Sequence, residues 1–164
     1  MSNSSWLPEL VMFDEYNGDW LRYVEAIYSI FKADFIDSKP GFHGRRMGLK
    51  RHPVVDGKEA TFWHFIQEGP VENERIPDLR RCERIRWPKP IIESSAKPQV
   101  HWWSNKRGGE TRILLALEDF SYVVVLADRG DYVLPWTAYY VEKMHSRKKL
   151  EKEFNEFKMR GNKG

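Results

Sequence analysis

The second half of the sequence contains a series of short segments that are rich in β-branched and aromatic residues. They are HWWS, ETRILLAL, FSYVVVLA, DYVLPW and TAYYVE, and the turn signals KRGG, EDF and RGD lie between them. This spacing is typical of an antiparallel meander. The apolar runs at 113–117 and 122–127 are nearly continuous, which predicts central strands that are covered on both faces. The chain must therefore build a sheet and place other elements on its two sides.

The segments before residue 99 carry helical patterns. The apolar positions of 19–35 lie on one helical face, which predicts an amphipathic helix. Asp56 and Glu59 form a capping pair that favours a helix over 57–67, although the same residues also alternate as a strand would. A short arginine-rich helix is expected over 77–86, between two prolines.

The last segment, HSRKKLEKEFNEFKMR, is highly charged and predicts a helix. Its only apolar stripe consists of Leu150, Phe154 and Phe157. Together these patterns predict an α+β fold, in which N-terminal helices pack on a four- to five-stranded antiparallel sheet and a charged helix follows at the C-terminus.

Length and composition limit the class of protein. The 164 residues are 41% hydrophobic, which is enough for one domain over 1–164, with flexible tails expected at 1–14 and 159–164. No apolar run approaches the roughly 20 residues of a membrane span, and MSNSSWLPEL lacks the features of a signal peptide, so a cytoplasmic protein without a membrane partner is expected. Cys82 is the single cysteine, and no Cys/His pairs have zinc-like spacing, so neither a metal nor another cofactor is expected.

The net charge of +3 is unevenly distributed. Residues 1–37 hold seven acids and two bases, which leaves +8 for the remainder. Basic residues recur in 43–52, 75–89 and 143–163. A basic body can hold a polyanion by neutralising its phosphates, so nucleic acid is the first partner to consider. The last of these runs fits a solvated helix face equally well.

His64 has the local context of a catalytic residue. It lies in ATFWHFIQEG, residues 60–69, among aromatic and aliphatic side chains. A polar side chain there needs either a partner or a functional reason for its desolvation. Two interpretations stay open: a packed histidine whose polar atoms are satisfied, and a catalytic base.

A run of arginines forms the second candidate feature. Arg80, Arg81, Arg84 and Arg86, with Lys89 just beyond, lie on the expected short helix and the loop after it. Guanidinium groups match phosphate oxygens, so the run predicts a phosphate clamp. A helix charged for solubility is the competing interpretation.

Strand alternation in TAYYVE supplies further candidates. It places Thr137 and Tyr139 on one face, where a hydroxyl and a phenol can donate hydrogen bonds to a phosphate or to a leaving oxygen. Arg46 in the basic loop, and Trp87 directly after the arginine run, are further expected substrate contacts.

Four segments, taken in order, resemble one ribonuclease superfamily. They are GKEATFWHFIQEG, RIPDLRRCERIRWPKPII, TRILLALEDFSYVVVLADRGDYVL and TAYYVEKMHSRKKLEKEF. They resemble the phage- and mobile-element-associated branch of the barnase, EndoU, colicin and RelE-like (BECR) ribonucleases, and the likeness covers about residues 15–158. It implies helices followed by a four-stranded antiparallel sheet with a metal-free active site. It also implies a toxin or phage-defence role, with a cognate antitoxin or immunity protein as partner.

Carried over by residue, the resemblance implies that His64 is the catalytic base. Arg81 and Arg84 then stabilise charge on the phosphorane, and Thr137 and Tyr139 complete the catalytic set on the last strand.

The expected activity is metal-independent cleavage of RNA, transfer RNA included, by attack of the 2′-hydroxyl. No second catalytic histidine aligns, so the general acid stays open between Lys89, Arg81 and Tyr139. The alternative function is a non-catalytic RNA-binding module of the same fold, whose exposed aromatic residues stack on bases.

Overall fold

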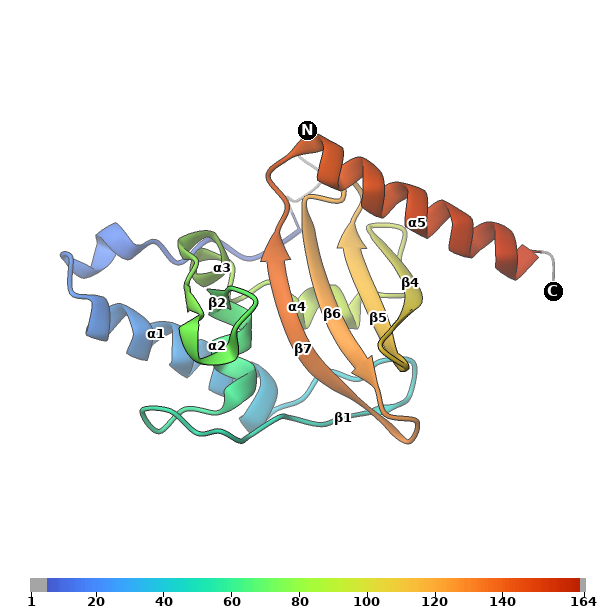
Figure 1. Cartoon of the computed structure of the whole chain (residues 1–164). Coiled ribbons are helices and arrows are strands. Elements are labelled where there is room, and N and C mark those ends of the chain that lie inside the picture. The colour runs from blue at the N-terminus through green and yellow to red at the C-terminus, as the bar shows by residue number, and fades with distance from the viewer. Residues whose placement is uncertain (1–5, 163–164) are drawn as a thin grey trace.

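The computed structural model describes residues 6–162, and an antiparallel meander forms its centre (Figure 1). The meander consists of β4 (Val100–Arg107), β5 (Glu110–Leu117), β6 (Tyr122–Asp128) and β7 (Tyr132–Tyr140). Gly108 and Gly109, both at positive φ, form the two-residue turn between β4 and β5, as a tight hairpin requires. The meander that the strand segments predict is confirmed.

A fifth strand corrects the prediction of a purely antiparallel sheet. β1 (Arg46–Met47) pairs in parallel with β7, and the order is β1-β7-β6-β5-β4. Two residues are too few to show alternation, so nothing in the sequence marks β1 as a strand. A separate two-stranded sheet is formed by β2 (Gln67–Glu68) and β3 (Ile76–Pro77).

Strand β7 contains a β-bulge at Trp136. Val125 pairs with Thr137 and Leu126 pairs with Pro135, so Trp136 has no partner residue on β6. Strict alternation would point Trp136 and Thr137 to opposite faces, but a bulge re-aims side chains locally. Both residues consequently line the same side of the sheet.

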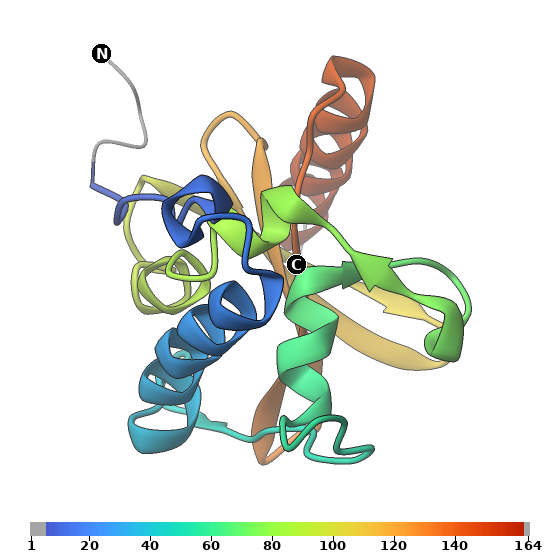
Figure 2. The same cartoon turned by 90° about the vertical axis from the view of Figure 1, so that its left-hand side faces the viewer.

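Helices on one side of the sheet form the larger core. They are α1 (Trp20–Lys32), its π-helical extension Ala33–Asp37, α2 (Ala60–Ile66), α3 (Leu79–Glu83) and α4 (Pro88–Glu93), with 3-10 turns at Phe13–Tyr16 and Glu72–Glu74. Figure 2 shows α1 and α2 side by side in front of the sheet. The apolar face of α1 is buried as predicted, because Tyr23, Ile27 and Phe31 are fully enclosed.

Two helix boundaries differ from the prediction. The helix expected over 57–67 is confirmed against the strand alternative, but it begins at Ala60. Asp56 does not cap it, because Asp56 lies in a left-handed turn before Gly57. The helix expected over 77–86 begins only at Leu79, because Asp78 caps it by accepting a hydrogen bond from the backbone N–H of Arg80.

Helix α5 (Met144–Asn162) packs on the opposite face of the sheet, at one end only. Its predicted apolar stripe is confirmed, because Leu150, Phe154 and Phe157 pack against the smaller core that contains Trp103 and Phe120. In Figure 1, α5 crosses that end of the sheet and projects beyond β4. Among residues 6–162, no other helix covers the rest of this face.

The expected N-terminal tail packs on the core from residue 6 onward. Val11 is buried, and its carbonyl oxygen accepts a hydrogen bond from the Tyr23 hydroxyl (2.7 Å). At the other end, 159–162 continue α5, whereas 1–5 and 163–164 lie outside the described residues. No helix within 6–162 is long and apolar enough to cross a membrane.

We expect the docking of α5 to depend on pH through His101. The ring of His101 lies between Phe120 and Phe154, with centroid distances of 5.2 and 4.5 Å. Burial lowers the pKa of His101 below its ordinary value of 6.5. Protonation of His101 is therefore easier in the unfolded chain than in the folded protein. The stability that neutral His101 contributes is lost as the pH falls below about 6.5 and through the lowered pKa.

His101→Phe should flatten the decrease in melting temperature between about pH 7 and pH 5, followed by circular dichroism. A variant whose melting temperature depends on pH as the parent's does would contradict this role.

Candidate functional site

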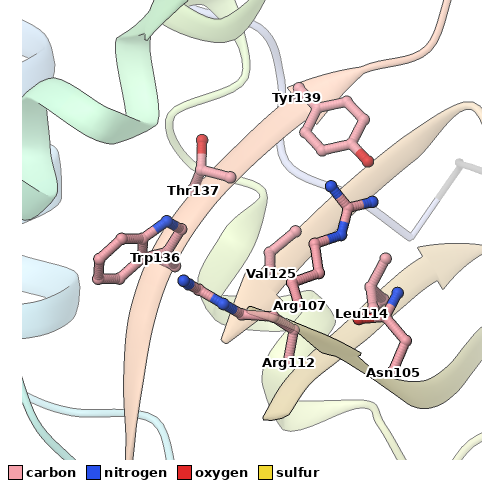
Figure 3. A pocket seen from close by; sticks show the side chains of 8 residues that line it. All are labelled: Asn105, Arg107, Arg112, Leu114, Val125, Trp136, Thr137 and Tyr139. Atoms are coloured by element: carbon pink, nitrogen blue, oxygen red, sulfur yellow. The ribbon is translucent and has the colours of Figure 1, made fainter. Parts of the chain in front are cut away.

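The part of the sheet face beyond α5 contains a hollow of about 240 Å³ (Figure 3). Its lining comes from the four strands of the meander: Asn105, Arg107, Arg112, Leu114, Val125, Trp136, Thr137 and Tyr139. The buried side chains of Leu114 and Val125 make its base apolar. In Figure 3, Arg107 extends toward the Tyr139 phenol and Arg112 extends toward Trp136. The hollow thus combines two guanidinium groups with two large aromatic rings.

Arg112 is held in a fixed orientation. Its Nη2 donates a hydrogen bond to Glu110 (2.6 Å), and its guanidinium carbon lies 4.1 Å from the centroid of the Trp136 ring. Burial lowers the pKa of Arg112, but an arginine stays protonated in proteins. Its Nη1 is buried and has no hydrogen-bond partner within residues 6–162. The group therefore presents a charged donor that the described protein atoms do not satisfy.

Positive charge prevails at this end of the sheet. Glu110 is shared between Arg112 and Arg129, at 2.6 and 2.7 Å, so one carboxylate faces two guanidinium groups. The side chain of Arg107, exposed at the end of β4, makes no ion pair in the described part of the chain. The hollow is consequently suited to an anionic ligand.

Tyr139 supplies a neutral hydrogen-bond donor. Burial raises the pKa of Tyr139, and the nearby charges of Arg107 and Arg81 only partly oppose this rise. The phenol therefore keeps its proton at neutral pH. It can donate a hydrogen bond or a proton into the hollow.

Thr137 and Arg81 join α2 to β7. The Thr137 hydroxyl donates to the carbonyl oxygen of His64 (2.8 Å) and accepts from Nη1 of Arg81 (3.2 Å). Arg81 also donates to the carbonyl oxygen of Gln67 and lies 3.5 Å from a carboxylate oxygen of Asp78. Its side chain is only 12% exposed, and burial lowers its pKa. Arg81 therefore forms part of the packed junction between these elements.

His64 lies directly beside the hollow. Its ring meets the ring of Trp136 edge-on, with centroids 5.5 Å apart, and the residue is 5% exposed. The structure therefore brings three of the predicted residues, His64, Thr137 and Tyr139, to one region around Trp136.

The predicted arginine run does not converge on one point. The Arg84 guanidinium lies 4.2 Å from the centroid of the Tyr140 ring and 5.1 Å from that of Trp87. Both rings pack against the larger core, on the face opposite the hollow. Arg80 is 60% exposed and its guanidinium lies 3.6 Å from Glu83. Position on a short helix alone did not predict these different environments.

Three more predicted contacts lie elsewhere. Arg86 and Lys89 line a separate hollow with Asp34 of the π-helical turn. Arg46 lies over the ring of Tyr132, at the start of β7, with 5.2 Å between its guanidinium carbon and the ring centroid.

Sequence reasoning missed Arg107, Arg112 and Trp136. A signal for Arg107 and Arg112 was present in the sequence, because the Gly108–Gly109 turn sets the hairpin register and pairs Asn105 with Arg112. Arg107 lies two residues after Asn105 on the same strand, so it shares the face of Arg112. Trp136 had no such signal, because its orientation depends on the bulge.

Comparisons of this protein with family models, with curated proteins and with solved structures found no match. Within residues 6–162, no three or more His, Cys, Asp or Glu side chains gather in a way that could hold a metal ion. The geometry of the hollow is therefore the basis on which a function can be proposed.

Removing the Thr137 hydroxyl should loosen the junction of α2 with β7. Thr137→Val leaves the His64 carbonyl and Arg81 each without one partner, which should cost about 1–3 kcal/mol of unfolding free energy. Urea denaturation measures this decrease, with Thr137→Ser as the control that keeps the hydroxyl. Equal destabilisation by the two substitutions would show that the hydroxyl is not what joins the elements.

Proposed function

We propose that the protein is a metal-independent endoribonuclease that holds single-stranded RNA in the hollow on its sheet. The observation that supports this most directly is that Arg107 and Arg112 line one hollow together with Trp136 and Tyr139. Arg112, whose buried Nη1 lacks an acceptor among the described residues, lies over the Trp136 ring.

The chemistry of the lining favours a single strand. Guanidinium groups bind phosphate oxygens, and aromatic rings stack on bases whatever their sequence. A base can lie on Trp136 only when it is not stacked within a duplex. Arg107 then lies on the phosphate side of the nucleotide, and a base on Trp136 lies next to Arg112, whose guanidinium is stacked over that ring.

The proposed reaction is an internal transesterification. The 2′-oxygen attacks the adjacent phosphorus, the bond from phosphorus to the 5′-oxygen breaks, and the products carry a 2′,3′-cyclic phosphate and a 5′-hydroxyl. Arg107 and Arg112 neutralise the charge that grows on the phosphorane, a kind of contribution worth about 10²- to 10³-fold per donor.

Proton transfer completes this proposal. Tyr139, kept neutral by its raised pKa, gives a proton to the leaving 5′-oxygen. His64, beside Trp136, accepts the proton of the 2′-hydroxyl. Exchange with water then restores both side chains. Thr137 and Arg81 act through His64, whose backbone they hold.

A second candidate function is RNA binding without cleavage. Two observations favour it. His64 is only 5% exposed, so little of the residue can reach a substrate, and the Thr137 hydroxyl already donates its hydrogen bond to a backbone carbonyl of the protein. The contacts to phosphate and base would be the same, but no group would accept the 2′-proton.

Incubation with bulk transfer RNA in excess EDTA separates the two functions. We expect cleavage that leaves cyclic phosphate ends, and we expect His64→Ala to lose at least about 10²-fold in rate while keeping its affinity for RNA. His64→Ala must melt near the parent temperature for the comparison to hold, and His64→Gln gives a polar control. Tight binding without cleavage by the parent protein would establish the second function, and absence of binding would overturn both.

Neutralising the two arginines of the hollow should weaken RNA binding. Arg107→Gln with Arg112→Gln should reduce the slope of log affinity against log salt by about 0.7 for each phosphate that is no longer neutralised. Fluorescence anisotropy over a salt series gives this slope. Arg80→Gln is the matched control, because Arg80 is exposed and lies outside the hollow. If the slope decreased in the Arg80→Gln control and stayed unchanged in the double variant, the RNA would bind at α3 and not in the hollow.

A further inference from the structure

A second pairing of a cation with an aromatic ring lies on β7, beyond the hollow. The guanidinium carbon of Arg46 is 5.2 Å from the centroid of the Tyr132 ring. The side chain of Val133 belongs to the larger core, so alternation points Tyr132 to the other face, which is the face of the hollow. Tyr132, Trp136 and Tyr139 are therefore three aromatic residues along one side of a single strand.

The segment that begins with β1 supplies the cations beside two of these rings. Arg46 pairs in register with Tyr132, and Lys50, four residues further on, lies 5.4 Å from the centroid of Trp136. Between them Gly48 lets the chain pass close to β7, since a Cβ at this position would lie only 2.9 Å from the Tyr132 ring. The ring of Tyr132 is thereby held against the backbone and kept in place beside Arg46.

Each of these three rings of β7 thus has at least one cation beside it. Arg46 accompanies Tyr132, Lys50 and Arg112 accompany Trp136, and Arg107 with Arg81 accompanies Tyr139. Repeated pairs of a cation and a ring suit a nucleic acid strand, because the positive groups attract phosphates and the flat apolar surfaces stack on bases.

We propose that Arg46 and Tyr132 form a second nucleotide-binding subsite, so that the substrate is an extended single strand lying along β7 from Tyr132 to Tyr139. This inference rests on the proposed function, because it adds a subsite to the same RNA-binding face. It makes the ligand a segment of several nucleotides and excludes a mononucleotide or a closed duplex as the preferred ligand.

Spacing sets the length of this segment. Four residues separate Tyr132 from Trp136, which is about 13 Å along a strand. Stacked nucleotides advance only about 3.4 Å each, so bases at the two rings cannot be neighbours in one continuous stack. At this advance, about 13 Å is roughly four steps, so a stacked strand that reaches both subsites spans about five nucleotides, and a dinucleotide reaches only one subsite.

Binding of short oligonucleotides tests the subsite. The probes are 2′-O-methyl oligouridylates of two, four, six and eight nucleotides, which lack the 2′-hydroxyl needed for cleavage, in competition with a labelled octamer at fixed salt. For the parent protein we expect affinity to rise steeply between two and six nucleotides and little thereafter. A 2′-O-methyl duplex of mixed sequence, long enough to stay closed at the assay temperature, should compete more weakly than a single strand of the same length.

Two substitutions isolate the second subsite. Tyr132→Leu and Arg46→Gln should each weaken hexamer binding, the former by about tenfold, and leave dinucleotide binding unchanged. Tyr132→Phe keeps the ring and should bind the hexamer as the parent does. Trp136→Leu should weaken both lengths, because it alters the first subsite. Arg46 is exposed, so Arg46→Gln stays informative even if Tyr132→Leu unfolds.

The outcomes separate this inference from the proposed function. The second subsite would be overturned if Tyr132→Leu and Arg46→Gln bound the hexamer as the parent does. Weak binding by Trp136→Leu in the same experiment would leave the first subsite intact. No binding of any probe by the parent would overturn both.

Discussion

The apolar character of both faces of β5 and β6 is the constraint on which this structure depends. One face is covered by the larger core under α1, α2 and α4, and the other is covered by α5 near Trp103 and Phe120 only. Where α5 ends, buried Leu114 and Val125 lie beneath charged and aromatic side chains. The long stems of such side chains can cover apolar surface while their polar ends reach solvent. The candidate site is therefore the part of this face that no described helix covers.

Strand β7 connects this site to the helices. Its bulge turns Trp136 toward the hollow, and Thr137, the next residue, bonds to the backbone of α2. Arg81 supports the same junction from α3, where backbone oxygens, the Thr137 hydroxyl and the Asp78 carboxylate hold its buried guanidinium group. This junction holds the backbone of His64 beside Trp136, and the proposed function requires a catalytic group positioned in this way.

Local pattern was enough to predict the meander, the long first helix, the apolar stripe of α5 and the shared face of Thr137 and Tyr139. It could not predict the environment of the arginine run, because stacked Arg84, internal Arg81 and exposed Arg80 look alike in a basic segment. Parallel pairing by β1 and the bulge at Trp136 are decided by tertiary contacts and leave no periodic signal. Our proposal therefore replaces the predicted phosphate clamp of the arginine run by Arg107 and Arg112 on the β4–β5 hairpin. The register of that hairpin could be predicted from its two-glycine turn.

The central claim is that RNA binds over Trp136, on the open face of the sheet. The indole N–H resonances in a ¹H–¹⁵N spectrum test this directly, once those of Trp136 and Trp87 are assigned by substitution. During titration with a single-stranded 2′-O-methyl oligonucleotide, we expect the Trp136 signal to shift until it saturates. The Trp87 signal should stay in place, because its N–H donates to the Pro8 carbonyl on the opposite face. A saturating shift of Trp87 with an unmoved Trp136 would contradict the account.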